Sequence, residues 1–190
     1  MKSTAGRLVS FGLTLLLNTS LLGSWAWADR HRDPLNQLEI DQLRDTAQEP
    51  DLRLKLYVKF ARARLDGIEQ VRSDPKVTDR AQQTHDRLQE FLDVYDELND
   101  NVDTYADRKE DLRKALKAVI DADTEFQAKL RALKSSATAV PAETQKYDFL
   151  LSSALDTVDS SAQDHRQLLA EQEEAAKHKK PAKAPAAGER

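Results

Sequence analysis

The sequence contains no cysteine and is poor in several other informative residues. Among its 190 residues are five glycines, six prolines and 6% aromatic residues. Without cysteine the chain cannot form a disulfide scaffold, a zinc ribbon, a c-type haem attachment or a lipid-modified anchor. The low glycine content argues against a β-sandwich with many tight turns. Full disorder is also excluded, because the hydrophobic residues (39%) recur at regular intervals rather than being scattered.

The first 28 residues have the pattern of a cleaved signal peptide. Lys2 and Arg7 precede an apolar stretch over 8–22, and Ala26-Trp27-Ala28 follows as a small-residue cleavage site. The apolar stretch is shorter than the roughly 20 residues that a membrane-spanning helix needs. We therefore expect cleavage after Ala28, export to the periplasm or the extracellular space, and no transmembrane helix in the mature protein.

Removal of residues 1–28 changes both the residue composition and the net charge of the chain. Both tryptophans, the single methionine and three of the five glycines lie in that segment. The remaining 162 residues carry 27 basic and 33 acidic side chains, a formal net charge of −6. This acidic balance excludes, by overall charge, a protein that binds nucleic acid.

Prolines and periodic apolar residues divide 29–176 into predicted helices, so we expect an all-α fold with a single helical-bundle domain. Asp33-Pro34 and Asp74-Pro75 each resemble an N-cap residue followed by proline in the first turn. Pro50 and Pro141 also suggest helix starts, because proline is tolerated there and disruptive further on. The predicted helices are 34–47, 50–73, one or two within 75–135, and 141–176.

The region 77–133 contains the most regular pattern. Positions spaced alternately by four and three residues are Val77, Ala81, Thr84, Leu88, Phe91, Tyr95, Leu98, Val102, Tyr105, Lys109, Leu112, Leu116, Val119, Asp123, Phe126, Leu130 and Leu133. We call these seventeen positions the seam; fourteen of them are apolar or aromatic.

The seam permits two architectures. An unbroken spacing favours one long central helix over 76–134 in an elongated antiparallel bundle, since a turn has no reason to preserve the phase of the pattern. The alternative is a compact four-helix bundle in which Asn99-Asp100-Asn101 turns the chain, because asparagine tolerates the backbone of a helix end.

The sequence contains no recognised catalytic or cofactor-binding motif. The sequence has no glycine-rich phosphate loop, G-x-S-x-G or H-E-x-x-H motif. His85 and His165 are the histidines on predicted helices, and neither has the glutamate three residues earlier that a di-iron bundle requires. We therefore expect no catalytic, cofactor-binding or metal-ligating residue, no cofactor, and a protein that is not an enzyme.

Acidic residues crowd one region of the chain. They are Asp93, Asp96, Glu97, Asp100, Asp103, Asp107, Glu110 and Asp111. Carboxylates suit calcium or magnesium, but such runs are usually a solvated helix face, which is the interpretation we favour. Lys109 and Asp123 stand out because they lie on the seam, where an unpaired charge is costly. They either set the register or mark places where the seam is open to water.

The C-terminal segment 177–190 differs from the rest of the mature chain. It is rich in lysine, proline and alanine with a net charge of +4, whereas 29–176 carries −10. We expect a disordered tail, because it has too few apolar residues to repay the entropy of ordering. A basic tail can make weak contact with anionic envelope surfaces.

These features favour an exported, non-catalytic helical interaction protein of the cell envelope, such as a scaffold, an adaptor or a holdase-like binder. Such a function implies a protein partner or self-association through apolar surface that the bundle leaves open. The alternative is a helical-bundle protein that binds a ligand or a divalent metal ion through the acidic cluster and the seam charges.

Overall fold

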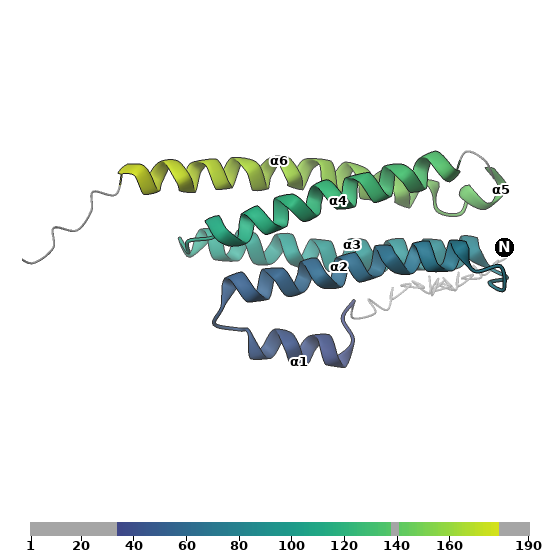
Figure 1. The fold of residues 1–190 in the computed structure, drawn as a ribbon, viewed down its shortest axis with the longest axis horizontal. Helices are drawn as coiled ribbons and strands as arrows, with labels where there is room; N and C mark the ends of the chain where they lie inside the picture. The colour runs from purple at the N-terminus through teal and green to yellow at the C-terminus, as the bar shows by residue number, and fades with distance from the viewer. Residues whose placement is uncertain (1–33, 138–140, 179–190) are drawn as a thin grey trace, which may run out of the picture. The chain divides into compact units, whose positions relative to one another are not determined.

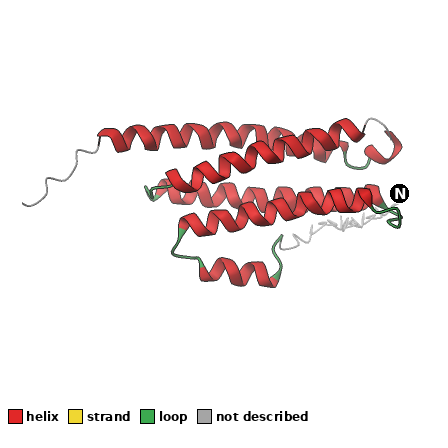
Figure 2. Ribbon diagram, viewed as in Figure 1, coloured by secondary structure: helices red, strands yellow, loops and turns green. Residues whose placement is uncertain are grey.

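The computed structural model describes residues 34–137 and 141–178, and all the regular structure within them is helical (Figures 1 and 2). These residues belong to one compact unit that begins at Asp33. The helices are α1 (Gln37–Asp45), α2 (Pro50–Ser73), α3 (Arg80–Asp107), α4 (Arg113–Ala137), α5 (Pro141–Thr144) and α6 (Asp148–His178). The predicted signal peptide and most of the predicted tail lie outside the described residues.

Helix α2 begins at Pro50 and ends at Ser73 as predicted, but two other predicted starts are wrong. Helix α1 begins at Gln37 rather than at residue 34, because Asn36 forms a capping box with Glu39. Asp74 caps the end of α2, and α3 starts six residues later behind the N-cap Asp79. In both cases a side chain further along satisfies the free amides of the first turn.

The long central helix over 76–134 is wrong. Helix α3 ends at Asp107 and α4 begins at Arg113, so the chain turns over residues 108–112. Lys109 adopts a left-handed backbone with φ 61°. Its amide donates to the carbonyl of Ala106, and the next amide donates to the carbonyl of Tyr105, which together form a Schellman motif. The turn predicted at residues 99–101 is also misplaced, because those residues lie inside α3.

A contact from α6 explains why the spacing of the seam did not predict the turn at residues 108–112. The side chain of Gln172 accepts a hydrogen bond from the Leu112 amide at 2.8 Å and donates to the Glu110 carbonyl at 3.0 Å. Leu112 is fully buried and so keeps the phase of the seam, whereas Lys109 is exposed in the turn. The seam therefore continues across a break that is stabilised by a residue sixty positions away.

The four long helices pack as a bundle, and side-chain contacts give their directions (Figure 1). Arg53 near the start of α2 hydrogen-bonds Asn101 near the end of α3, so these two helices run in opposite directions. Asp51 pairs with Lys114 at the start of α4, so α2 and α4 run in the same direction. Helix α6 packs against both α3 and α4, which closes the core.

The core is apolar and aromatic at its centre. Phe91, Tyr95 and Phe126 are fully buried, with ring centroids 5.5–6.1 Å apart in edge-on and stacked pairs. Fifteen of the seventeen seam positions are buried; Val77 is half-buried and Lys109 is exposed. No helix of the described segments combines the length and the apolar character of a bilayer-spanning segment.

The structure differs from the prediction at the last helix and at the start of the tail. A break separates the short α5 from α6, and there Tyr147 is buried and its hydroxyl accepts a hydrogen bond from Arg72 at 2.9 Å. Helix α6 then continues through Lys177 and His178, two residues into the predicted tail. Both interact with Glu174, at 3.0 and 2.9 Å, and these contacts stabilise the last turn of the helix.

Candidate functional site

The two seam charges occupy opposite environments. Lys109 lies in the exposed turn, whereas Asp123 of α4 is 0% exposed and forms the centre of a polar network. The Tyr95 hydroxyl from α3 donates to Asp123 Oδ1 at 2.8 Å. His165 Nδ1 from α6 lies 2.9 Å from Asp123 Oδ2. Because an ionised carboxylate can only accept, this geometry places a proton on Nδ1.

The network extends towards the surface between α3 and α6. Ser161 lies near the Tyr95 hydroxyl, where it acts to lower the Tyr95 pKa, and the Asn99 amide donates to Ser161 Oγ at 3.0 Å. The buried Asn99 Oδ1 has no hydrogen-bond partner within 34–137 and 141–178. Burial, and then the negative charge of Asp123, raise the pKa of Tyr95 far above its ordinary value. Tyr95 therefore stays protonated and remains a donor to the carboxylate.

This network connects three helices but is closed to substrates. Tyr95 and Asp123 are fully buried and His165 is 4% exposed. No lysine or arginine of the described segments pairs with Asp123, so Tyr95 and His165 are its side-chain partners there. Burial of a charge without such a partner is expensive. The geometry therefore supports a role in fixing the register of α3, α4 and α6 rather than a role in chemistry.

The other residues singled out from the sequence do not join this network. His85 lies near the start of α3, ten residues before Tyr95, beside Asp86 at 3.4 Å. Of the eight acids of the cluster, seven are exposed and Asp93 is half-buried. Within the described segments no three His, Asp or Glu side chains are grouped so that they could hold a metal ion. The exposed positions of these acids agree with a solvated helix face.

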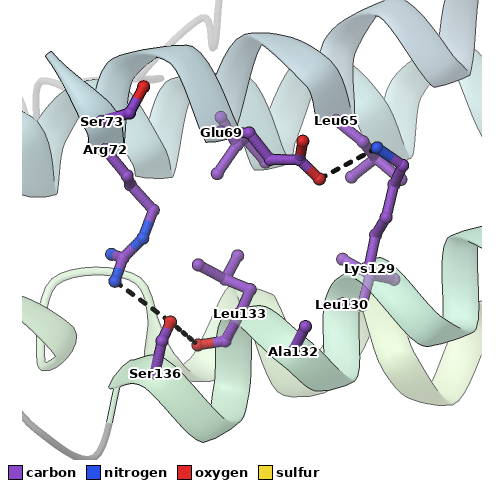
Figure 3. Close-up of a pocket in the computed structure, with 10 residues that line it drawn as sticks. Leu65, Glu69, Arg72, Ser73, Lys129, Leu130, Ala132, Leu133 and Ser136 are labelled. Carbon is purple, nitrogen blue, oxygen red and sulfur yellow. Dashed lines mark hydrogen bonds and ion pairs between the residues drawn. The ribbon is translucent and has the colours of Figure 1, made fainter.

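A groove between α2 and α4 is lined by both apolar and charged side chains. Its volume is about 410 Å³. It lies near the C-terminal ends of both helices, and Figure 3 shows its side chains. The lining residues are Leu65, Ile68, Glu69, Arg72 and Ser73 from α2, and Lys129, Leu130, Ala132, Leu133 and Ser136 from α4.

Two polar bridges cross this groove from one helix to the other. The bridge between Glu69 and Lys129 measures 2.9 Å, and the bridge between Arg72 and Ser136 measures 3.1 Å (Figure 3). Leu133 points into the space between the two bridges. The bridges therefore link the two helices across the groove, above apolar side chains that are 0–8% exposed.

The two cations of the groove have different partners. Lys129 lies between Asp66 at 2.8 Å and Glu69 at 2.9 Å, and these hydrogen bonds, the one with Asp66 first, raise its pKa. Arg72 donates only to neutral oxygens, the Tyr147 hydroxyl and Ser136 Oγ. Within the described segments its charge is balanced by no carboxylate in direct contact.

Two further hollows, of about 630 and 550 Å³, lie at the other end of the bundle, around the 108–112 turn. Charged side chains such as Asp111 and Arg113 contribute to both. Charged side chains form a larger share of their lining than of the lining of the α2–α4 groove, so we take that groove as the candidate binding site.

The sequence predicted none of the groove's features. Leu130 and Leu133 are seam positions and were expected in a core, and they are 0% and 8% exposed. Leu65 and Ile68 of α2 are each 3% exposed. Nothing in their spacing indicates that their outer edges would face each other across a gap. The one sequence feature that could have pointed to the groove is Arg72, a cation in the last turn of α2, where cations are common. Comparison with protein-family models, with curated proteins and with solved structures finds no match for this chain.

Proposed function

We propose that this protein is an exported, non-catalytic helical interaction protein of the cell envelope, and that it binds its partner at the α2–α4 groove. The observation that carries the proposal is the groove itself, a hollow of about 410 Å³ whose lining combines apolar side chains with a polar rim. Ligand and partner sites are commonly of this kind. In this proposal the helices form an antiparallel bundle behind a cleaved signal peptide, and a basic tail follows.

Export is tested on the protein made in its native host. Mass spectrometry of the purified product should give Asp29 as the first residue, and fractionation should place the protein outside the cytoplasm. A product that retains residues 1–28 and stays in the cytoplasm contradicts this part of the proposal.

The groove is tested by site-specific photo-crosslinking in cells. A photoreactive amino acid replaces Ala132, which is exposed and lines the groove. The matched control carries it at Ala128, which is exposed on the same helix but does not line the groove. We expect one discrete adduct from position 132 that is absent from position 128. An adduct of twice the subunit mass identifies self-association, and equal adducts at both positions contradict the proposal.

A ligand-binding function is the second candidate, and Arg72 favours it. A guanidinium at the edge of an apolar groove, satisfied by two hydroxyl groups alone, is suited to an anionic group of a bound molecule. The divalent-metal version of this candidate receives no such support. A rise in the melting temperature of the protein on titration with calcium or magnesium would support the divalent-metal candidate.

A further inference from the structure

We propose that the protein partner bound at the α2–α4 groove presents an acidic side chain, aspartate or glutamate, to the guanidinium of Arg72. This inference rests on the proposed function, because it assumes that a protein partner occupies the groove. The added element is the chemistry by which that partner is recognised. Three observations carry it: the hydrogen-bond donors around Arg72, the fixed position of its guanidinium, and the charges beside it.

Hydrogen-bond donors outnumber acceptors where Arg72 contacts Tyr147 and Ser136. A guanidinium carries five N–H donors and accepts nothing. Arg72 donates to the Tyr147 hydroxyl at 2.9 Å and to Ser136 Oγ at 3.1 Å. Among the described residues, the proton of the Tyr147 hydroxyl has no acceptor of its own. The group that this place lacks is an acceptor, and a carboxylate supplies two accepting oxygens.

The same two contacts hold the guanidinium in a fixed position. Tyr147 is 1% exposed, and Ser136 lies in the last turn of α4, so both acceptors belong to the packed bundle. Figure 3 shows the Arg72 side chain reaching from α2 to Ser136. A side chain that is already oriented loses less conformational entropy on binding. An arginine held in this way is suited to the planar, bidentate pair that a guanidinium forms with a carboxylate.

The charges beside Arg72 favour an anion with a single negative charge. Lys129 is bound by Asp66 at 2.8 Å and by Glu69 at 2.9 Å, so these three side chains together carry one negative charge. Glu69 is three residues from Arg72 on α2, which is about 4.5 Å along the helix axis. A phosphate dianion at Arg72 would be repelled more strongly by this excess charge than a single carboxylate would.

Arg62 shows the same kind of bridge with its acid present. It also reaches from α2 to α4, where the Glu125 carboxylate accepts three hydrogen bonds of 2.8–3.0 Å. At Arg72, α4 presents the neutral Ser136 instead of an acid. The carboxylate that is missing at this second bridge is the group that we assign to the partner.

The test compares variants of Arg72 in the crosslinking experiment from position 132 in the native host. Arg72→Gln should lower the yield of the adduct about tenfold, since a hydrogen bond to a charged group is worth about 1.5–3 kcal/mol. Arg72→Lys keeps the charge without the bidentate geometry and should give an intermediate yield. Arg62→Gln is the matched control, because Arg62 already has its carboxylate and does not line the groove. Its yield should equal that of the parent, and circular dichroism melts verify that each variant is folded.

Mass spectrometry of the adduct then locates the segment of the partner that lies at the groove. We expect an aspartate or glutamate close to the crosslinked position, also when the partner is a second copy of this chain. Replacement of that acid by arginine should abolish the adduct with the parent protein, and Arg72→Glu should restore it. A purely structural role of Arg72 does not predict this restoration, because glutamate cannot donate to Tyr147 and Ser136 as arginine does.

Three results overturn the inference and leave the proposed function standing. They are an unchanged adduct from folded Arg72→Gln, an equal loss in Arg62→Gln, and a crosslinked segment without an acidic side chain. Failure of the exchanged charges to restore the adduct also overturns the inference. If position 132 of the parent protein gives no discrete adduct, the proposed function and the inference are both wrong.

Discussion

At the scale of single residues, the buried carboxylate of Asp123 has the largest structural consequence. Its two oxygens are used by Tyr95 of α3 and His165 of α6, so one side chain connects three helices. A buried acceptor that loses its donor retains the cost of its desolvation. The hydroxyl of Tyr95 should therefore matter more to stability than its size indicates.

We predict that Tyr95→Phe lowers the free energy of unfolding by about 1–3 kcal/mol, because it leaves Asp123 Oδ1 without its donor. The measurement is urea denaturation followed by circular dichroism. Tyr105→Phe is the matched control, since Tyr105 is also buried but its hydroxyl has no hydrogen-bond partner among the described residues. A similar loss in both variants would show that the Asp123 contact is not the cause.

Lys109 carries backbone strain that a glycine would relieve. Its φ of 61° at the residue after the α3 C-cap is a position where glycine is normally preferred. We predict that Lys109→Gly raises the free energy of unfolding by about 0.5–1 kcal/mol. Lys55→Gly, at an exposed position in the interior of α2, should lower it by about 1 kcal/mol. Changes of the same sign in the two variants contradict the assignment of the turn.

At the scale of elements, α1 differs from the four long helices in how it is held. Leu43 is its buried apolar side chain, and its remaining attachment to α2 is largely polar. The Glu39 carboxylate accepts two hydrogen bonds of 2.7 Å from Arg64, and the Leu43 carbonyl accepts one from Arg53. A helix of nine residues has little stability of its own. Its position therefore depends on the charge of Glu39.

Acid should release α1 before the bundle unfolds. Burial alone would raise the pKa of Glu39, but hydrogen bonds from Arg64 and the Asn36 amide outweigh it and lower the pKa. A lowered pKa means that the contribution of Glu39 is complete above its unfolded pKa of about 4.3 and is lost as the pH falls through the folded value. We predict that residues 37–45 lose hydrogen-exchange protection, measured relative to the intrinsic exchange rate at the same pH, below about pH 4.

The control for this prediction is Glu39→Gln, which keeps the shape of the side chain without its charge. Its α1 amides should have little protection at neutral pH, and that protection should change little with acid, while amides of α3 and α4 stay protected in both proteins. Protection of α1 that is independent of pH in the parent protein would contradict the role assigned to Glu39.

At the scale of the whole molecule, the turn at 108–112 decides which helices become neighbours. It places α4 beside α2, where Arg62 binds Glu125 through hydrogen bonds of 2.8–3.0 Å. A single helix over 76–134 would instead carry Glu125 far beyond the reach of α2. The pair Arg62 and Glu125 therefore distinguishes the two arrangements.

The absence of native cysteine makes this distinction easy to measure. We predict that the double variant Arg62→Cys/Glu125→Cys is crosslinked within one chain by a short bis-maleimide reagent. The control Arg62→Cys/Asp159→Cys should not be, since Asp159 of α6 pairs with Arg131 rather than with any residue of α2. The measurement is the mobility shift of the monomer in denaturing gels. Crosslinking of the control alone would reject the arrangement of the helices.

Local physics alone determined the helical class of this protein and much of its core. Pro50 begins a helix because its missing amide costs nothing in a first turn, and α2 has the predicted bounds. The spacing of the seam identified positions that are buried in the structure, because burial on a helix follows its 3.6-residue period. These features depend on residues close together in the chain.

Tertiary structure decided where the chain turns, what Asp123 contacts and where apolar surface stays open. Gln172 stabilises the turn from sixty residues away, and His165 reaches Asp123 from forty-two residues away. The groove exists because α2 and α4 approach each other without filling the space beside Leu133 and Arg72. Such features depend on the distance between helix surfaces, and periodicity along one helix contains no information about that distance.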